Sequence, residues 1–429
     1  MPRLAPLPTV LLLCAVVGCA LLPRVGPALA GYHPSPDAAE YLLLARSLAR
    51  GEGYVLPVRV RLIEEHADEP VAHPAHAERA PLWPLGLAPL VALLGPEPGW
   101  PDPRLQLLGV ALAALAAAQA AELTLTLARQ RRLGPRSAGW AALLAGLAVA
   151  WQPSLVRASI HLWAEPLGLV LGLLCLRGAL GLRGRPTCRV AWTALVLGAG
   201  LARYARPEAW VLLPLALVAA PAGRRLAAAL ALGALTGAGI AWTGALAPQL
   251  FLLRVDHYAQ ATHVATAPTA ADALTGALGN LLDQLRHLAL PKNAWLVLPL
   301  ALVGARWRGA RLLLGWALLN TLATCAVWST RDPHRFTLAT FVALAPVAAV
   351  EAEALRKRYA SGERTVFAAW VGVWVLVFGH SAGRELRGAP PPPAPAVPAL
   401  QDAPPALPDP WSYALETGGP AVLAREQTE

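Results

Sequence analysis

Long apolar runs recur along the chain, from residues 4–22 near its start to residues 365–380 near its end. Of the 429 residues, 56% are hydrophobic and only 14% are charged. A single soluble core cannot bury that much apolar surface. We therefore expect an all-α polytopic integral membrane protein.

The apolar runs predict about 11 transmembrane helices. The run at residues 85–94 is left out, because a helix needs roughly 20 residues to cross a bilayer. We interpret that run as a re-entrant or interfacial helix. The expected spans are residues 4–22, 104–127, 138–152, 162–180, 190–203, 208–221, 226–246, 293–305, 312–328, 336–350 and 365–380.

The basic residues give this topology a direction. If residues 85–94 are not counted as a span, one basic loop is expected in the cytoplasm, as the positive-inside rule requires. This loop carries Arg129, Arg131, Arg132 and Arg136. The N-terminus is then cytoplasmic and the C-terminus lies outside. The formal net charge of +10 comes largely from such loops, so we expect membrane lipids and no nucleic acid as partners. The bias toward Ala, Leu and Arg suggests a bacterial inner membrane.

We expect one membrane domain, residues 1–380, with large outer loops at residues 23–103 and 247–292. Residues 381–429 are rich in proline and lack periodicity, which predicts a disordered tail on the outer face. We interpret the first apolar segment as a retained anchor. A cleaved or lipidated start stays open, because Ala28-Leu29-Ala30 resembles a cleavage site and Val16-Val17-Gly18-Cys19 resembles a lipoprotein box.

The first outer loop holds the clearest candidate for chemistry. Ser35 can cap a helix that begins at Pro36 and ends near Gly51, since proline needs no backbone donor at the first helical position. Asp37 and Glu40 then share one face of this short interfacial helix. We expect Asp37, with Glu40 beside it, to act as a general base. The alternatives are an acid that only favours the helix start for Asp37 and a solvated residue for Glu40.

Further polar residues fall on the same side of the predicted membrane, and one cavity could gather them. They are Glu78, Arg79, His161, Glu165, Arg203, Arg206, His334 and Arg335. A carboxylate that faces several arginines can deprotonate a hydroxyl while the arginines neutralise a departing phosphate. Two plainer interpretations stay open: Arg203 and Arg206 could anchor short spans at the headgroups, and His161 with Glu165 could be a buried i,i+4 pair.

No cofactor is predicted, and the sequence does not support a requirement for a divalent metal. His257, His263 and His287 are too widely spaced to argue for a metal site. The five cysteines lie in or beside apolar runs without metal-type spacing, so we interpret them as membrane-packing residues.

Five short motifs occur in a fixed order. They are Asp37-x-x-Glu40-Tyr41, Arg79-x-Pro81-Leu82-Trp83-Pro84, Ser159-(x)5-Glu165-Pro166-Leu167, Leu201-Ala202-Arg203-Tyr204-Ala205-Arg206-Pro207-Glu208 and His334-Arg335-Phe336. This order resembles the polyprenyl-phosphate-sugar-dependent membrane glycosyltransferases of the GT-C superfamily, and it looks most like the protein mannosyltransferase and aminoarabinose transferase group (glycosyltransferase family 39-like). The resemblance covers about residues 1–350. It implies that Asp37 is the catalytic base and that outer-face arginines bind the donor's lipid phosphate; by position these are Arg203, Arg206 and Arg335.

The expected function is transfer of a hexose or pentose from a polyprenyl-phosphate donor to an outer-face acceptor, which is a lipid, a glycan or a protein. A transporter or flippase of a lipid-linked or anionic substrate is the main alternative, because it would also use charges at membrane depth. Transporters commonly have repeated halves around a midplane site, and we find no internal repeat in this sequence. A non-catalytic subunit for envelope assembly is a weaker alternative.

Overall fold

A computed structural model describes residues 6–30, 36–56, 75–76, 79–94, 103–246, 269–289, 297–325, 335 and 337–358. These parts of the chain are helical apart from one short ribbon of two antiparallel strands. The expected span 365–380, the tail 381–429 and the candidate residues Glu78 and His334 lie outside the described residues.

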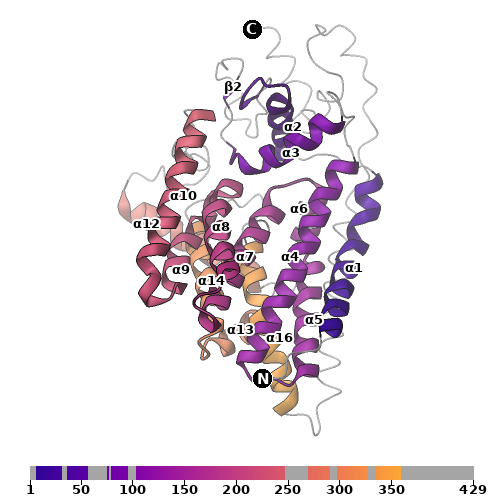
Figure 1. The fold of residues 1–429 in the computed structure, drawn as a ribbon, viewed down its shortest axis with the longest axis vertical. Coiled ribbons are helices and arrows are strands. Elements are labelled where there is room, and N and C mark those ends of the chain that lie inside the picture. Colours follow the sequence, from indigo (N-terminus) through magenta and orange to yellow (C-terminus); the bar gives the residue numbers. More distant parts are fainter. Residues whose placement is uncertain are drawn as a thin grey trace.

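Helices account for nearly all of the described elements (Figure 1). The first half comprises α1 (Pro6–Ala30), α2 (Pro36–Ala49), β1 (Val55–Leu56), β2 (Ala75–His76), α3 (Leu82–Leu94), α4 (Pro103–Gln130), α5 (Pro135–Ala150), α6 (Pro153–Ile160) and α7 (Glu165–Gly184). The second half comprises α8 (Arg189–Ala205), η2 (Pro207–Val211), α9 (Leu212–Ala219), η3 (Ala222–Arg224), α10 (Arg225–Leu246), α12 (Ala270–Ala289), α13 (Val297–Gly304), α14 (Ala310–Cys325) and α16 (Leu338–Arg358).

Five helical segments in the described residues are long and apolar enough to cross a membrane: α1, α4, α7, η3 with α10, and α16. A sixth results if α5 and α6, which meet at a bend of 54°, are counted as one span. This confirms an all-α, multi-pass membrane protein. The expected total of 11 spans is not confirmed, since the apolar segments Pro207–Ala219 and Ala310–Cys325 are shorter.

Local sequence explains several helix boundaries. Proline needs no backbone donor at the first helical position, and it is the first residue of five of the described α-helices, at Pro6, Pro36, Pro103, Pro135 and Pro153. The Gln152 side chain caps α6 by accepting a hydrogen bond of 2.7 Å from the backbone N–H of Leu155. The expected end of the first span at residue 22 is wrong, because α1 continues through Pro23 and Pro27.

The core depends on small residues that let helix backbones approach closely. α4 buries a row of alanines where it packs against α1, α5 and α7. Between α7 and α8, a Cβ atom at Gly198 would lie 2.5 Å from the backbone N of Cys175, and one at Gly178 would overlap the backbone of Leu195. A larger residue at either glycine would force the two helices apart.

One end of the bundle is capped by two helices from the segment between α1 and α4. α2 and α3 lie across this end (Figure 1), and their buried apolar side chains form a cluster with the turn between α6 and α7. Trp83 of α3 fixes this contact, because its Nε1–H donates a hydrogen bond of 2.8 Å to the carbonyl O of Leu162. α3 has only 13 residues, as expected for a helix that does not span.

The opposite end of the bundle carries basic turns. Buried Glu351 of α16 pairs with Arg131, in the turn after α4, over 3.5 Å and with Arg306, in the turn after α13, over 3.2 Å. Arg183, in the last turn of α7, donates a hydrogen bond of 2.8 Å to the carbonyl O of Arg308. These contacts bring the α4–α5, α7–α8 and α13–α14 turns together at one end.

Candidate active site

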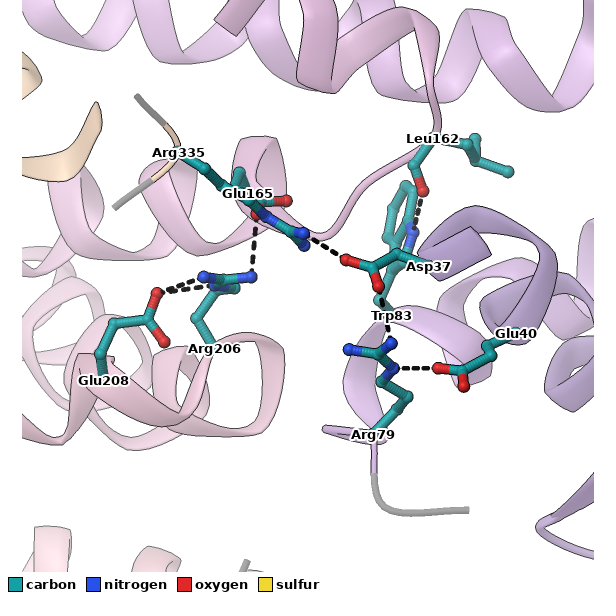
Figure 2. Close-up of polar contacts among 9 residues, drawn as sticks. All are labelled: Asp37, Glu40, Arg79, Trp83, Leu162, Glu165, Arg206, Glu208 and Arg335. Carbon is teal, nitrogen blue, oxygen red and sulfur yellow. Dashed lines mark hydrogen bonds and ion pairs between the residues drawn. The ribbon is translucent and has the colours of Figure 1, made fainter. Parts of the chain in front are cut away.

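Seven described side chains of alternating charge form one continuous chain of ion pairs at the end of the bundle where α2 and α3 lie (Figure 2). None of these seven side chains is more than 18% exposed. In order, they are Glu40, Arg79, Asp37, Arg335, Glu165, Arg206 and Glu208. We call these seven side chains the ion-pair chain. Its four carboxylates and three guanidinium groups give it a formal charge of −1.

Asp37 lies in the first turn of α2, where the helix dipole favours a carboxylate. Its Oδ1 accepts a hydrogen bond of 2.6 Å from Arg79 Nη2, and its Oδ2 accepts one from Arg335 Nη1. Burial alone would raise the pKa of this carboxyl, but the charges of Arg335 and Arg79 and the hydrogen bond from Arg335 outweigh it. The pKa of Asp37 is therefore held below its usual range, and the group is a carboxylate at neutral pH.

Arg79 joins Asp37 to Glu40, which accepts a hydrogen bond from Arg79 Nε. The backbone at Arg79 is fixed by the Tyr54 hydroxyl, which donates a hydrogen bond of 2.8 Å to its carbonyl O. Burial raises the pKa of Tyr54 well above its usual value, so this hydroxyl keeps its proton. The Arg79 guanidinium also lies 5.9 Å from the centroid of the Tyr41 ring. Glu40 is thus a buried member of the site rather than a solvated helix-face residue.

Arg335 precedes α16 and links the two halves of the ion-pair chain. Its Nη1 donates to Asp37 and its Nε donates to Glu165. The guanidinium lies 4.5 Å from the centroid of the Trp163 ring, which serves as a platform beneath it. Trp163 belongs to the α6–α7 turn, in which Leu162 adopts a left-handed backbone with a φ of 58°.

Glu165 is the first residue of α7 and accepts from both arginines through one oxygen. Arg206 Nη1 donates to Oε1 over 2.9 Å, and Arg335 Nε donates to the same atom. The other oxygen, Oε2, is buried without a hydrogen-bond partner in the described part of the chain. Arg206 in turn donates from Nε to Glu208 over 2.7 Å. Gly168 makes room for Arg206, whose Cγ would lie 2.8 Å from a Cβ at that position.

A pocket opens beside these last residues. Charged residues line it together with Asn320 and apolar side chains of α7, η2, α9, α14 and α16. The lining residues are Glu165, Gly168, Leu169, Arg206, Glu208, Ala209, Leu212, Trp316, Asn320, Arg335, Leu338 and Ala339. This lining offers a ligand both charged and apolar contacts.

The structure brings most of the expected site residues together. Six of them join the ion-pair chain: Asp37, Glu40, Arg79, Glu165, Arg206 and Arg335. Arg203 is not among the pocket residues, and its guanidinium lies instead 3.7 Å from the centroid of the Trp210 ring. His161 stacks on Trp163 with the ring centroids 5.5 Å apart, and it does not share a helix with Glu165.

Two members of the site were not predicted from the sequence, Glu208 and Trp163. Glu208 lies two residues after Arg206 in a short polar stretch between apolar runs, and that opposite charge was the available signal. Trp163 had no comparable signal, because its role depends on the fold of the α6–α7 turn. Within the described residues, no group of three or more His, Cys, Asp or Glu side chains is placed to hold a metal ion.

Comparison with family models, with curated proteins and with solved structures finds no match to this chain.

Proposed function

We propose that the chain is a GT-C-type integral membrane glycosyltransferase that transfers a sugar from a polyprenyl-phosphate donor to a hydroxyl of an outer-face acceptor. One observation carries the proposal: Arg335 pairs with the carboxylate of Asp37 and also lines a pocket that has both charged and apolar walls. The reaction needs a base near the anomeric carbon, cations at the departing phosphate and an apolar surface for the lipid chain. These requirements meet around one guanidinium.

The proposed reaction uses Asp37 as the base. Asp37 accepts the proton of the acceptor hydroxyl while the hydroxyl oxygen attacks the anomeric carbon of the donor. The bond between that carbon and the phosphate oxygen breaks, and its electron pair leaves with the polyprenyl phosphate. Arg206 and Arg335 neutralise the charge that develops on the phosphate. Attack and departure occur on opposite faces of the sugar, so the anomeric configuration is inverted.

The resting ion pairs define what the donor must displace. Glu165 forms ion pairs with Arg206 and Arg335, the two arginines that line the pocket. A phosphate that takes the place of Glu165 draws Arg335 away from Asp37. Asp37 then keeps Arg79 but loses its second cation, so its pKa rises toward the usual range. Donor binding thereby frees one oxygen of Asp37 and makes that group a stronger base.

The position of the site in the membrane also supports this function. Basic turns gather at one end of the bundle and the ion-pair chain lies at the other end. We take the basic end to be cytoplasmic, in line with the positive-inside rule, and propose the outer face of a bacterial inner membrane for the site. An 11-span topology with the C-terminus outside fits this orientation. A transporter would be expected to place its charges near the bilayer midplane, and the end position of this site favours an enzyme.

The test uses purified full-length protein and a panel of radiolabelled polyprenyl-phosphate sugars, each with lipid, glycan and protein acceptor fractions. We expect one donor to be consumed with stoichiometric release of polyprenyl phosphate. Glu52→Gln is the matched control, because Glu52 is an acid at the end of the same helix with a side chain 47% exposed. Transfer should persist in Glu52→Gln and be lost in Asp37→Asn. Translocation of the intact donor across proteoliposomes without cleavage would establish a flippase instead.

A further inference from the structure

Arg203 is a buried cation that the candidate active site does not use. It lies in the last turn of α8, and its side chain is 0% exposed. All three guanidinium nitrogens lack a hydrogen-bond partner within the described residues. Arg206, only three residues later, donates to two carboxylates. A buried, unpaired charge is strongly unfavourable, so Arg203 needs an anion that is not part of the described chain.

Two aromatic rings hold the Arg203 guanidinium in place. Its Cζ lies 3.7 Å from the centroid of the Trp210 ring and 4.4 Å from that of the Tyr204 ring. The Tyr204 hydroxyl donates a hydrogen bond of 3.0 Å to the carbonyl O of Thr236 in α10. Gly239 admits this ring, because a Cβ there would overlap the hydroxyl. Aromatic contacts stabilise the cation but give its N–H groups no acceptor.

The surroundings indicate where the missing anion comes from. Tyr204 connects Arg203 to α10, an apolar helix with large exposed side chains such as Leu230 at 66% and Trp242 at 41%. Such a surface faces lipid in a membrane protein. Trp210, 38% exposed, forms the outer wall of the Arg203 site, and tryptophan is typical of the membrane interface. A lipid headgroup that reaches the guanidinium has to displace this side chain.

We propose that Arg203, Tyr204 and Trp210 form a binding site for the phosphate of an anionic phospholipid, separate from the Arg206–Arg335 pocket. The planar fork of arginine matches two phosphate oxygens, and the rings fix its orientation in advance. This site does not rest on the proposed glycosyltransferase function. It gives the outer-face end of α8 a specific bound lipid.

The experiment measures thermal unfolding of delipidated full-length protein in a neutral detergent. Phosphatidylglycerol, phosphatidylcholine and inorganic phosphate are added in separate titrations. We expect phosphatidylglycerol to raise the Tm of the parent by about 2–4 °C more than phosphatidylcholine does, as for a ligand that binds only the folded state. Arg203→Gln should lose this difference, with apparent affinity for phosphatidylglycerol at least about tenfold weaker. Arg177→Gln is the control, because Arg177 lies outside both sites with a side chain 51% exposed, and it should keep this difference.

A second comparison separates lipid binding from a merely structural role. Without added lipid, Arg203→Gln should melt no lower than the parent, because the substitution removes an uncompensated charge. A phosphatidylglycerol response of equal size in Arg203→Gln and the parent would overturn the proposal. An equal response to inorganic phosphate would also overturn it, in favour of a free-phosphate site. If Arg203→Gln does not accumulate, Trp210→Leu replaces it, and an unchanged lipid affinity in that variant refutes the aromatic site.

Discussion

Replacing Glu165 with Gln should weaken the fold and strengthen donor binding at the same time. Glu165 pairs with Arg206 and Arg335, and its side chain is only 5% exposed. Removing one partner of a buried ion pair typically costs about 3–5 kcal/mol. Here Oε1 accepts both hydrogen bonds, and Oε2 has no partner in the described residues. A glutamine oxygen can still accept the hydrogen bonds that Oε1 accepts. We therefore expect a cost at or just below the bottom of that range, about 2–3 kcal/mol.

The effect on donor binding has the opposite sign because, in the proposed reaction, Glu165 competes with the donor phosphate for the same two guanidinium groups. The substitution changes the charge of the ion-pair chain from −1 to zero. Losing one competing charge-assisted hydrogen bond should tighten the binding of polyprenyl phosphate by about tenfold or more. Thermal unfolding and displacement of a labelled polyprenyl phosphate measure the two effects on one preparation.

Glu122→Gln is the control for this pair of measurements. Glu122 also forms an ion pair with an arginine, Arg177, over 2.8 Å, but its side chain is 33% exposed and lies outside the candidate site. Its substitution should change stability by less than about 1 kcal/mol and leave lipid-phosphate affinity unchanged. Weaker binding of polyprenyl phosphate to Glu165→Gln would refute the displacement of Glu165 by the donor.

Three further outcomes are expected. In a variant without its native cysteines, Gly134→Cys in the α4–α5 turn should be shielded from impermeant reagents added outside intact cells, and rapid labelling there would reverse the topology. Arg206→Lys keeps the charge but loses the fork, so KM for the donor should rise about tenfold in folded protein, whereas an unchanged KM in Arg206→Ala would remove this residue from the site. The pKa of Asp37 is lowered in the folded state, so its ion pairs contribute fully above about pH 4 and are lost as the pH falls through the lower folded value. The Tm difference between the parent and Asp37→Asn should accordingly stay constant from about pH 7 to 5 and shrink below about pH 4; a difference that shrinks near neutral pH would contradict the lowered pKa.

Helix positions could be predicted from the sequence because apolar runs determine which segments enter the membrane. The expected span 104–127 corresponds to α4, Pro103–Gln130, and 190–203 corresponds to α8, Arg189–Ala205. Irregular features were missed because hydropathy does not encode them. The separate helix α6 results from the bend before Pro153, and α12 lies inside what was expected to be an outer loop.

The gathering of Asp37, Arg79 and Glu165 could be predicted because all three adjoin apolar runs on one side. Which arginine binds which carboxylate could not, because the pairing depends on side-chain directions. Arg203 and Arg206 show why: α8 ends at Ala205, and Arg206 has an extended backbone with φ −144° and ψ 119°. Arg206 therefore contacts Glu165, while Arg203 contacts aromatic rings.

The role of Asp37 as the base is decided by comparing donor binding with sugar transfer in Asp37→Asn, using the labelled donor that the parent consumes. Asparagine keeps the shape, but its single amide oxygen can accept from only one of the two arginines that bind the two oxygens of Asp37, and it cannot take up the acceptor proton. We expect donor affinity within about threefold of the parent and transfer slower by about a hundredfold or more. Glu40→Gln should lose less, since Glu40 contacts Arg79 behind the reacting carboxylate. Transfer by folded Asp37→Asn at close to the parent rate would place the base at another residue.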